Sequence, residues 1–166
     1  MYLANSSGLK VGITRATQVP TRWIDQGATQ ALAIIRVRNR LQSGILEVMF
    51  KQQVSDKTNW RAMLKGEAEP LKMEEEAALL LKECDSELNE LKEHFGVFAI
   101  SVLNGIASVG INYPVVKYPE KVTSFNFDKH PVVEGTLLGI KGQYLIFDTG
   151  VINLRRFSGY HVKLSH

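Results

Sequence analysis

Opposite charges are concentrated in different parts of this 166-residue chain. Residues 1–65 carry a net charge of +7, residues 66–96 carry −7 and residues 97–166 carry +3. The acidic part has the apolar spacing of an amphipathic helix, whereas short apolar runs separated by turn residues flank it on both sides. This pattern predicts a basic domain (1–65), an acidic helical connector (66–96) and a weakly basic domain (97–166).

Composition narrows the class of protein. Hydrophobic residues make up 45% of the chain and charged residues 22%, which is ordinary for a globular protein of a size that buries its own core. The single cysteine, Cys84, excludes an internal disulfide and a zinc site of paired thiolates. Since no apolar run reaches the length of a membrane span, we expect a cytoplasmic protein without membrane association.

The first 65 residues have the pattern of a ββαβα domain. Turn-forming residues 5–8 separate two apolar runs, which predicts a hairpin of strands 2–5 and 9–14. Pro20 and Gly27 bound a short helix at 20–26. The β-branched run 31–37 predicts a third strand, and Ser43 is a candidate cap for the next helix.

The rest of the chain predicts helices followed by strands. We expect a short helix at 59–64, with Asn59 as its cap, and one long helix at 70–95. Glycines then punctuate apolar runs as in a small β-barrel or an antiparallel sheet. These runs are 111–118, 122–127, 132–140, 143–147, 151–155 and 160–164. The predicted fold class is therefore α+β.

The opening residues resemble the GIY-YIG endonuclease superfamily, in its compact branch with Lys-Val-Gly as the second triplet. Tyr2 stands at the tyrosine of the first triplet, and residues 10–12 are Lys-Val-Gly. Arg22 follows Gly12 by ten residues, the family spacing for its arginine, and Glu47 matches the family's metal-binding glutamate. The resemblance covers residues 1–65, less than half of the chain.

This resemblance implies metal-dependent hydrolysis of a phosphodiester bond. Tyr2 would help to deprotonate the attacking water, Arg22 would bind the scissile phosphate, and Glu47 would hold one Mg²⁺ or Mn²⁺ ion. Lys10 replaces the second tyrosine of other members, and it is either a base with a lowered pKa or a point charge that holds phosphate. The predicted catalytic set is Tyr2, Lys10, Arg22 and Glu47.

Basic side chains outside this set predict contacts with DNA or RNA. Arg36, Arg38 and Arg40 alternate along the end of one strand, either as a phosphate-binding stripe or as a solvated edge. In the third part, cations alternate with aromatic residues as on oligonucleotide-binding barrels, although any half-polar sheet has similar alternation. The predicted nucleic-acid-binding set is Arg15, Arg36, Arg38, Lys51, Lys141, Arg155 and Arg156.

Two other functions fit the same sequence. A non-catalytic nucleic-acid-binding module would keep the fold and the basic face without an efficient base. A protein-interaction adaptor would use the acidic helix as a docking surface for a protein partner. For single residues the ordinary alternatives are an ion pair of Arg22 with Asp25 or Glu47, and a core position for Tyr2.

The whole chain also resembles a bacterial family of unassigned function. The resemblance rests on the strings at 3–12, 21–28, 57–61 and 139–146. Members of that family usually have a cysteine-containing segment ahead of the first strand. The resemblance therefore implies that this chain is a fragment or a shortened member.

Overall fold

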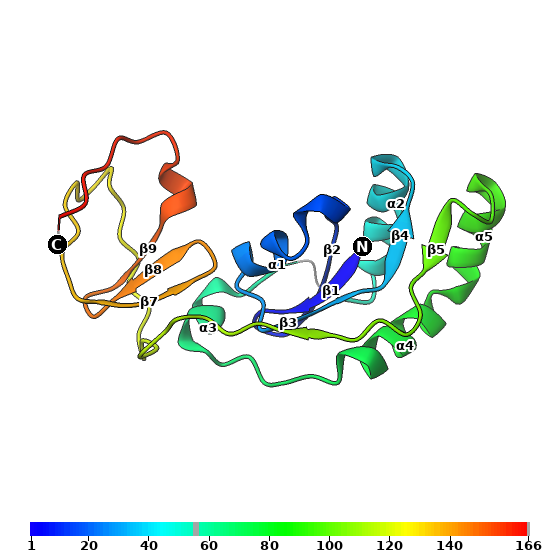
Figure 1. Ribbon diagram of the computed structural model, residues 1–166, viewed down its shortest axis with the longest axis horizontal. Helices are drawn as coiled ribbons and strands as arrows, with labels where there is room; N and C mark the ends of the chain where they lie inside the picture. The colour runs from blue at the N-terminus through cyan, green and yellow to red at the C-terminus, as the bar shows by residue number, and fades with distance from the viewer. Residues whose placement is uncertain (55–56, 166) are drawn as a thin grey trace.

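The computed structural model describes residues 1–54 and 57–165 and has an α+β fold, as predicted. Figure 1 shows an elongated arrangement in which the sheet of the opening residues occupies the middle. A second sheet from the end of the chain lies on one side of it, and two helices lie on the other. Within the described residues no helix is long and apolar enough to cross a membrane.

The central sheet confirms the predicted hairpin. Strands β1 (Tyr2–Asn5) and β2 (Leu9–Gly12) pair antiparallel, with Tyr2 directly opposite Gly12. The strand order is β2-β1-β3-β6, with β3 (Gln30–Ala33) and β6 (Val109–Gly110). Strand β2 is therefore an edge of the sheet, and β1 has a neighbour on each side.

The predicted single strand at 31–37 is wrong, because the structure divides it into β3 and β4 (Ile35–Val37). Ile34 and Ile35 are consecutive and both buried. Consecutive side chains of a regular strand point to opposite faces of the sheet, so the two could not both face one core. The chain bends between them, and β4 pairs with β5 (Ile100–Val102) in a separate two-stranded sheet.

Two short helices pack on the central sheet. Helix α1 (Thr21–Asp25) is close to its predicted bounds and follows a 3-10 turn, η1 (Ala16–Gln18). Helix α2 (Arg40–Phe50) begins earlier than predicted, because Asn39 and not Ser43 caps it. Asn39 accepts a hydrogen bond from the Gln42 backbone, and the Gln42 side chain accepts one from the Asn39 backbone, which forms a capping box.

One helix precedes the connector and two helices lie within it. Helix α3 (Trp60–Lys65) confirms the predicted helix and its Asn59 cap, which accepts from the Ala62 backbone. The long helix predicted at 70–95 is wrong, because the chain breaks at Cys84 into α4 (Met73–Glu83) and α5 (Asp85–Phe95). Buried Leu80 and Leu88 lie on either side of this break, which redirects the apolar side of α5 onto the same core as α4.

The end of the chain forms an open three-stranded sheet. Its strands are β7 (Leu137–Lys141), β8 (Tyr144–Phe147) and β9 (Val151–Asn153), followed by a 3-10 turn, η2 (Leu154–Phe157). The predicted antiparallel sheet is confirmed, but no sheet among the described residues closes into a barrel.

Several strands predicted for this part are wrong. The runs 111–118 and 122–127 contribute only the isolated bridges Val115–Gly139 and Ser124–Val151, and 160–164 forms no strand. Pro114 and Pro119 lack the N–H group that a central strand needs, and Val116 is 90% exposed. These apolar runs therefore lack the burial that a regular strand requires.

Part-buried amides attach the connector to the central sheet. The Gln30 side chain accepts from the Leu71 backbone N–H at 2.8 Å and donates to the Leu71 carbonyl at 2.9 Å. Asn5 donates to the Glu69 carbonyl at 2.7 Å and to the Gln30 side-chain oxygen at 3.1 Å. The side chain of Gln30 thus pairs with Leu71 much as a neighbouring strand would.

Replacing Gln30 tests this attachment. Gln30→Ala should lower the free energy of unfolding by about 2 kcal/mol, because it leaves the polar groups of Leu71 and Asn5 without partners. Urea unfolding measures the change, with the exposed Gln52→Ala as the control. An equal, small effect of both substitutions would show that the amide contacts do not hold the connector.

Candidate functional site

The ring of Tyr2 lies across Gly12 on the neighbouring strand. A Cβ atom at Gly12 would be 2.6 Å from the Tyr2 hydroxyl oxygen, so only glycine leaves room for the ring. Tyr2 is 1% exposed and packs against Trp23 of α1, with ring centroids 6.0 Å apart. Because β2 is an edge strand, this geometry carries the hydroxyl toward the edge of the sheet.

One amide contacts this hydroxyl, and charged side chains of two helices influence its pKa. Gln26 donates a hydrogen bond to it at 2.5 Å. Burial raises the pKa of Tyr2; the Gln26 hydrogen bond and the interactions with Arg22 partly oppose this shift, and the charge of Glu47 adds to it. Tyr2 is therefore a neutral phenol at physiological pH, within the electrostatic reach of both predicted residues.

Arg22 and Glu47 come from helices on opposite faces of the sheet. Helix α1 packs through Trp23 on the face that carries Tyr2, whereas α2 packs through Leu46 on the opposite face. Both side chains nevertheless influence the pKa of Tyr2, Arg22 by lowering it and Glu47 by raising it. Because β2 is an edge strand and Gly12 has no side chain, the Tyr2 hydroxyl can lie within reach of charges on both faces.

Glu47 is the predicted ligand for a divalent ion. Its side chain is 24% exposed and lies 3.7 Å from Lys51, four residues along the same helix. Partly exposed pairs of this kind are weak, so a cation can compete with Lys51 for the carboxylate. The described residues contain no group of three or more His, Cys, Asp or Glu side chains that could hold a metal. A Mg²⁺ ion fits only with water and substrate oxygens as its other ligands.

Lys10 occupies the same sheet face as Tyr2 but makes a different contact. It lies opposite Ala4 in the hairpin register, is 5% exposed, and donates from Nζ to the Thr58 hydroxyl at 2.5 Å. This contact ties β2 to the segment that precedes α3. The structure therefore places the Lys10 ammonium at Thr58, just before α3.

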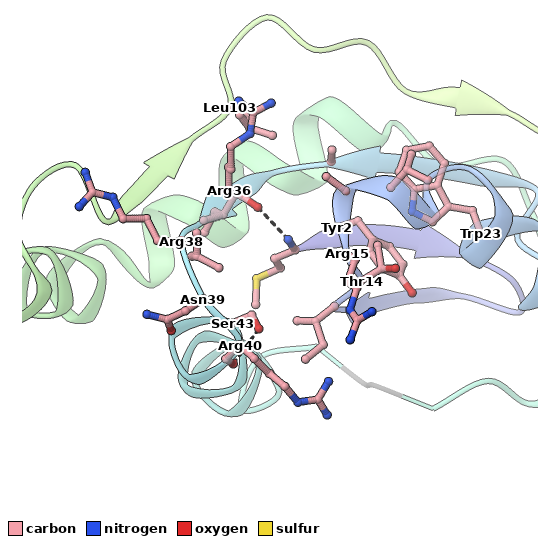
Figure 2. A pocket seen from close by; sticks show the side chains of 17 residues that line it. Tyr2, Thr14, Arg15, Trp23, Arg36, Arg38, Asn39, Arg40, Ser43 and Leu103 are labelled. Atoms are coloured by element: carbon pink, nitrogen blue, oxygen red, sulfur yellow. Dashed lines mark hydrogen bonds between the residues drawn. The ribbon is translucent and has the colours of Figure 1, made fainter.

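A groove borders the site on one side. It has a volume of about 610 Å³, and Arg15, Arg36 and Arg38 of the predicted binding set line it together with Arg40. Figure 2 shows these arginines extending from separate segments, with Tyr2 and Trp23 at one end of the groove. Three cations of the predicted binding set, together with Arg40 of the predicted stripe, therefore line a single concavity.

The predicted cations of the C-terminal part are not gathered in this way. Lys141 is fully buried and lies 5.6 Å from the ring centroid of Tyr113 and 5.0 Å from that of Tyr118. It cannot reach a phosphate from this position. Arg155 lies 3.5 Å from Asp25, and Arg156 is exposed beside the ring of Phe157.

Comparison with protein families gives one result. The family described as "Protein of unknown function (DUF2797)" matches residues 1–162, which is nearly the whole chain. The chain belongs to this family. Comparisons with curated proteins and with solved structures find no match.

Sequence reasoning missed one polar residue of this DUF2797 site and placed another, Arg40, on a strand instead of a helix. Gln26 lies four residues after Arg22, a spacing that places both side chains on one side of α1, and this was the available signal. Arg40 is the first residue of α2, and its place in the groove depends on how that helix packs beside β4.

A side chain at residue 12 should disturb the DUF2797 site. Gly12→Ala should lower the free energy of unfolding by about 2 kcal/mol, because the new methyl group overlaps the Tyr2 ring. Gly110→Ala is the matched control, since open space surrounds that glycine in β6. Chemical unfolding measures both variants, and an equally small effect of both would contradict the packing of Tyr2 on Gly12.

Lys141 gives a prediction with a defined pH dependence. Its Nζ has no hydrogen-bond partner among the described residues, and burial lowers its pKa. Lys141→Met should therefore raise the free energy of unfolding at neutral pH by about 1 kcal/mol.

The sign of the pH dependence follows from proton binding. In the window below the ordinary lysine pKa of 10.5, the unfolded chain holds more protons than the folded DUF2797 protein, so wild-type stability rises with pH. The advantage of Lys141→Met should shrink as pH approaches that value. Urea unfolding at neutral and alkaline pH measures this stability difference. Lys163→Met, at an exposed lysine, is the control. If the difference in unfolding free energy between wild type and Lys141→Met did not change with pH, the Lys141 amine would not be a charged, desolvated group at neutral pH.

Proposed function

We propose that this DUF2797 protein hydrolyses phosphodiester bonds in nucleic acid, with a divalent ion, at a site like that of the GIY-YIG endonucleases. One observation carries the proposal. Arg22 and Glu47, from different helices and 25 residues apart in the sequence, both influence the pKa of Tyr2, whose ring lies across Gly12. A core tyrosine with a purely structural role needs neither charge.

Arg22 supplies the positive charge that a phosphodiester requires. Its planar guanidinium can donate two hydrogen bonds to one phosphate group, which fixes the orientation of the phosphate as well as its position. The same donors offset the negative charge that develops on the phosphoryl oxygens as the water oxygen attacks phosphorus. The substrate phosphate would thus lie between Arg22 and the Tyr2 hydroxyl.

The chemistry of Tyr2 follows from its environment. Its oxygen already accepts a hydrogen bond from Gln26, so its own proton is available to donate. Because burial raises its pKa, Tyr2 keeps that proton at neutral pH. It would therefore orient the water or the phosphate by donating a hydrogen bond.

Glu47 would hold the divalent ion. Mg²⁺ or Mn²⁺ supplies a bound water of lowered pKa and offsets the charge on the leaving oxygen. The carboxylate of Glu47 is a hard oxygen donor at the partly exposed end of the site, which suits such an ion. Lys51 would release its contact with Glu47 when the ion binds.

A second function, binding without cleavage, is favoured by a different observation. The Lys10 ammonium, one candidate base, donates to Thr58, and the raised pKa of Tyr2 disfavours a phenolate. A protein with these features would keep phosphate contacts at Arg22 without an efficient proton acceptor. Measured cleavage separates the two functions.

Cleavage of labelled substrates tests the proposal. The wild type should cut single-stranded, duplex or branched DNA or RNA with Mg²⁺ or Mn²⁺ and not with EDTA. Arg22→Ala and Glu47→Gln should each reduce the rate by about 100-fold or more, since each removes one group that stabilises the transition state. The exposed Lys82→Ala and Glu90→Gln are matched controls and should cleave like the wild type.

Two outcomes would contradict this mechanism. Equal cleavage by wild type, Arg22→Ala and Glu47→Gln would remove these residues from the reaction. Salt-sensitive binding by the wild type, with no cleavage of any substrate, would support the binding function instead.

A further inference from the structure

The groove beside Tyr2 has the features of a binding site for an anion. Its lining contains four arginines and no Asp or Glu. Figure 2 shows Arg15 extending from the segment after β2, Arg36 and Arg38 from β4 and the residues after it, and Arg40 from the start of α2. Among the described residues none of these arginines forms an ion pair. Four cations around one concavity are therefore left without intramolecular counter-charges.

A buried donor in the same groove is also unpartnered. The indole nitrogen of Trp23 has no hydrogen-bond partner among the described residues, although Trp23 is only 5% exposed. Trp23 lines the groove next to Tyr2 (Figure 2). A buried N–H without an acceptor is costly, so a ligand that offers an oxygen here recovers that cost.

Much of the remaining lining is apolar, and Thr14, Asn39 and Ser43 are its other polar residues. Ile13, Val37 and Leu103 are half-buried side chains along the groove, and the N-terminus of α2 opens at Arg40. The positive end of the helix dipole adds to the arginine charges. The groove therefore combines an apolar surface with cations, which suits a ligand that has both an apolar ring and a phosphate.

We propose that this groove binds an unpaired stretch of nucleic acid and leads it to Tyr2. The inference rests on the proposed function for the cleavage step, because it assigns the single-stranded substrate class to that site. A volume of 610 Å³ accommodates about one or two nucleotides and not a duplex. The bases of a duplex are stacked inside, so only an unpaired base can lie on the apolar surface while its phosphates meet the arginines.

Tyr2 connects the groove to the reacting groups. Its ring lines one end of the groove, and its hydroxyl is influenced by Arg22 and Glu47. A strand that lies along the arginines therefore presents its next phosphate at Arg22. On this basis the preferred substrate is a flap, a tail or another unpaired segment.

Binding in EDTA tests this groove separately from cleavage. The probe is a fluorescent single strand of about ten nucleotides, compared with a duplex of the same length. The wild type should bind the single strand at least tenfold more tightly. Arg36→Ala with Arg38→Ala should weaken binding by about tenfold or more, and should reduce the slope of log Kd against log salt by about 1.4, for two lost phosphate contacts.

Two further variants sharpen the test. Trp23→Phe should weaken single-strand binding about threefold while leaving the salt slope unchanged, because it removes a neutral donor. Lys82→Ala with Lys92→Ala removes the same charge from α4 and α5 and should bind like the wild type. Inorganic polyphosphate, which offers phosphates without bases, should compete poorly.

The outcomes are distinguishable from those of the cleavage test. Equal affinity for duplex and single strand, unchanged binding by the double arginine variant, or equal competition by polyphosphate would overturn the groove proposal. Groove-dependent binding without any cleavage by the wild type would support the groove and contradict the proposed hydrolysis. Glu47→Gln should keep the binding and lose the cleavage.

Discussion

The packing of the Tyr2 ring on Gly12 is the contact on which the candidate site depends. The hairpin register sets these residues opposite each other, and the missing side chain at Gly12 lets the ring cross the edge strand. The sheet otherwise separates α1, which carries Arg22, from α2, which carries Glu47. Arg22 and Glu47 can therefore both influence the pKa of this hydroxyl only because the Tyr2 ring extends to the edge strand β2.

The C-terminal part supports the helix that carries Arg22. Tyr113 shares its hydroxyl proton between the carbonyls of Ile24 and Ala28, at 3.1 and 3.0 Å. Arg155 lies 3.5 Å from Asp25 at the end of the same helix. These contacts explain why aromatic and basic residues of this part can matter for the site without touching a substrate. Lys141 lies in the same region beside the ring of Tyr113.

Charge distribution connects the site to its surroundings. The positive charge of residues 1–65 is partly collected at the groove beside Tyr2, where no carboxylate lines the surface. The acidic residues of α4 and α5 belong to helices that pack on the core shared with Ile35 of β4, beside β5 (Figure 1). The basic groove and the acidic helices therefore both lie near β4.

The sequence by itself determined the α+β class and the first hairpin, because turn residues act between near neighbours, and its resemblance to the GIY-YIG endonucleases supplied the candidates Tyr2, Arg22 and Glu47. It could not determine the bend at Ile34 or the break at Cys84, since both depend on where the apolar side chains find a core. Tertiary structure alone buried Lys141 among tyrosines and brought Arg15 to the same groove as the arginines at 36–40. Strands β5 and β6 likewise pair with β4 and β3 across more than 60 residues, and such partners are selected by packing over the whole chain rather than by local pattern.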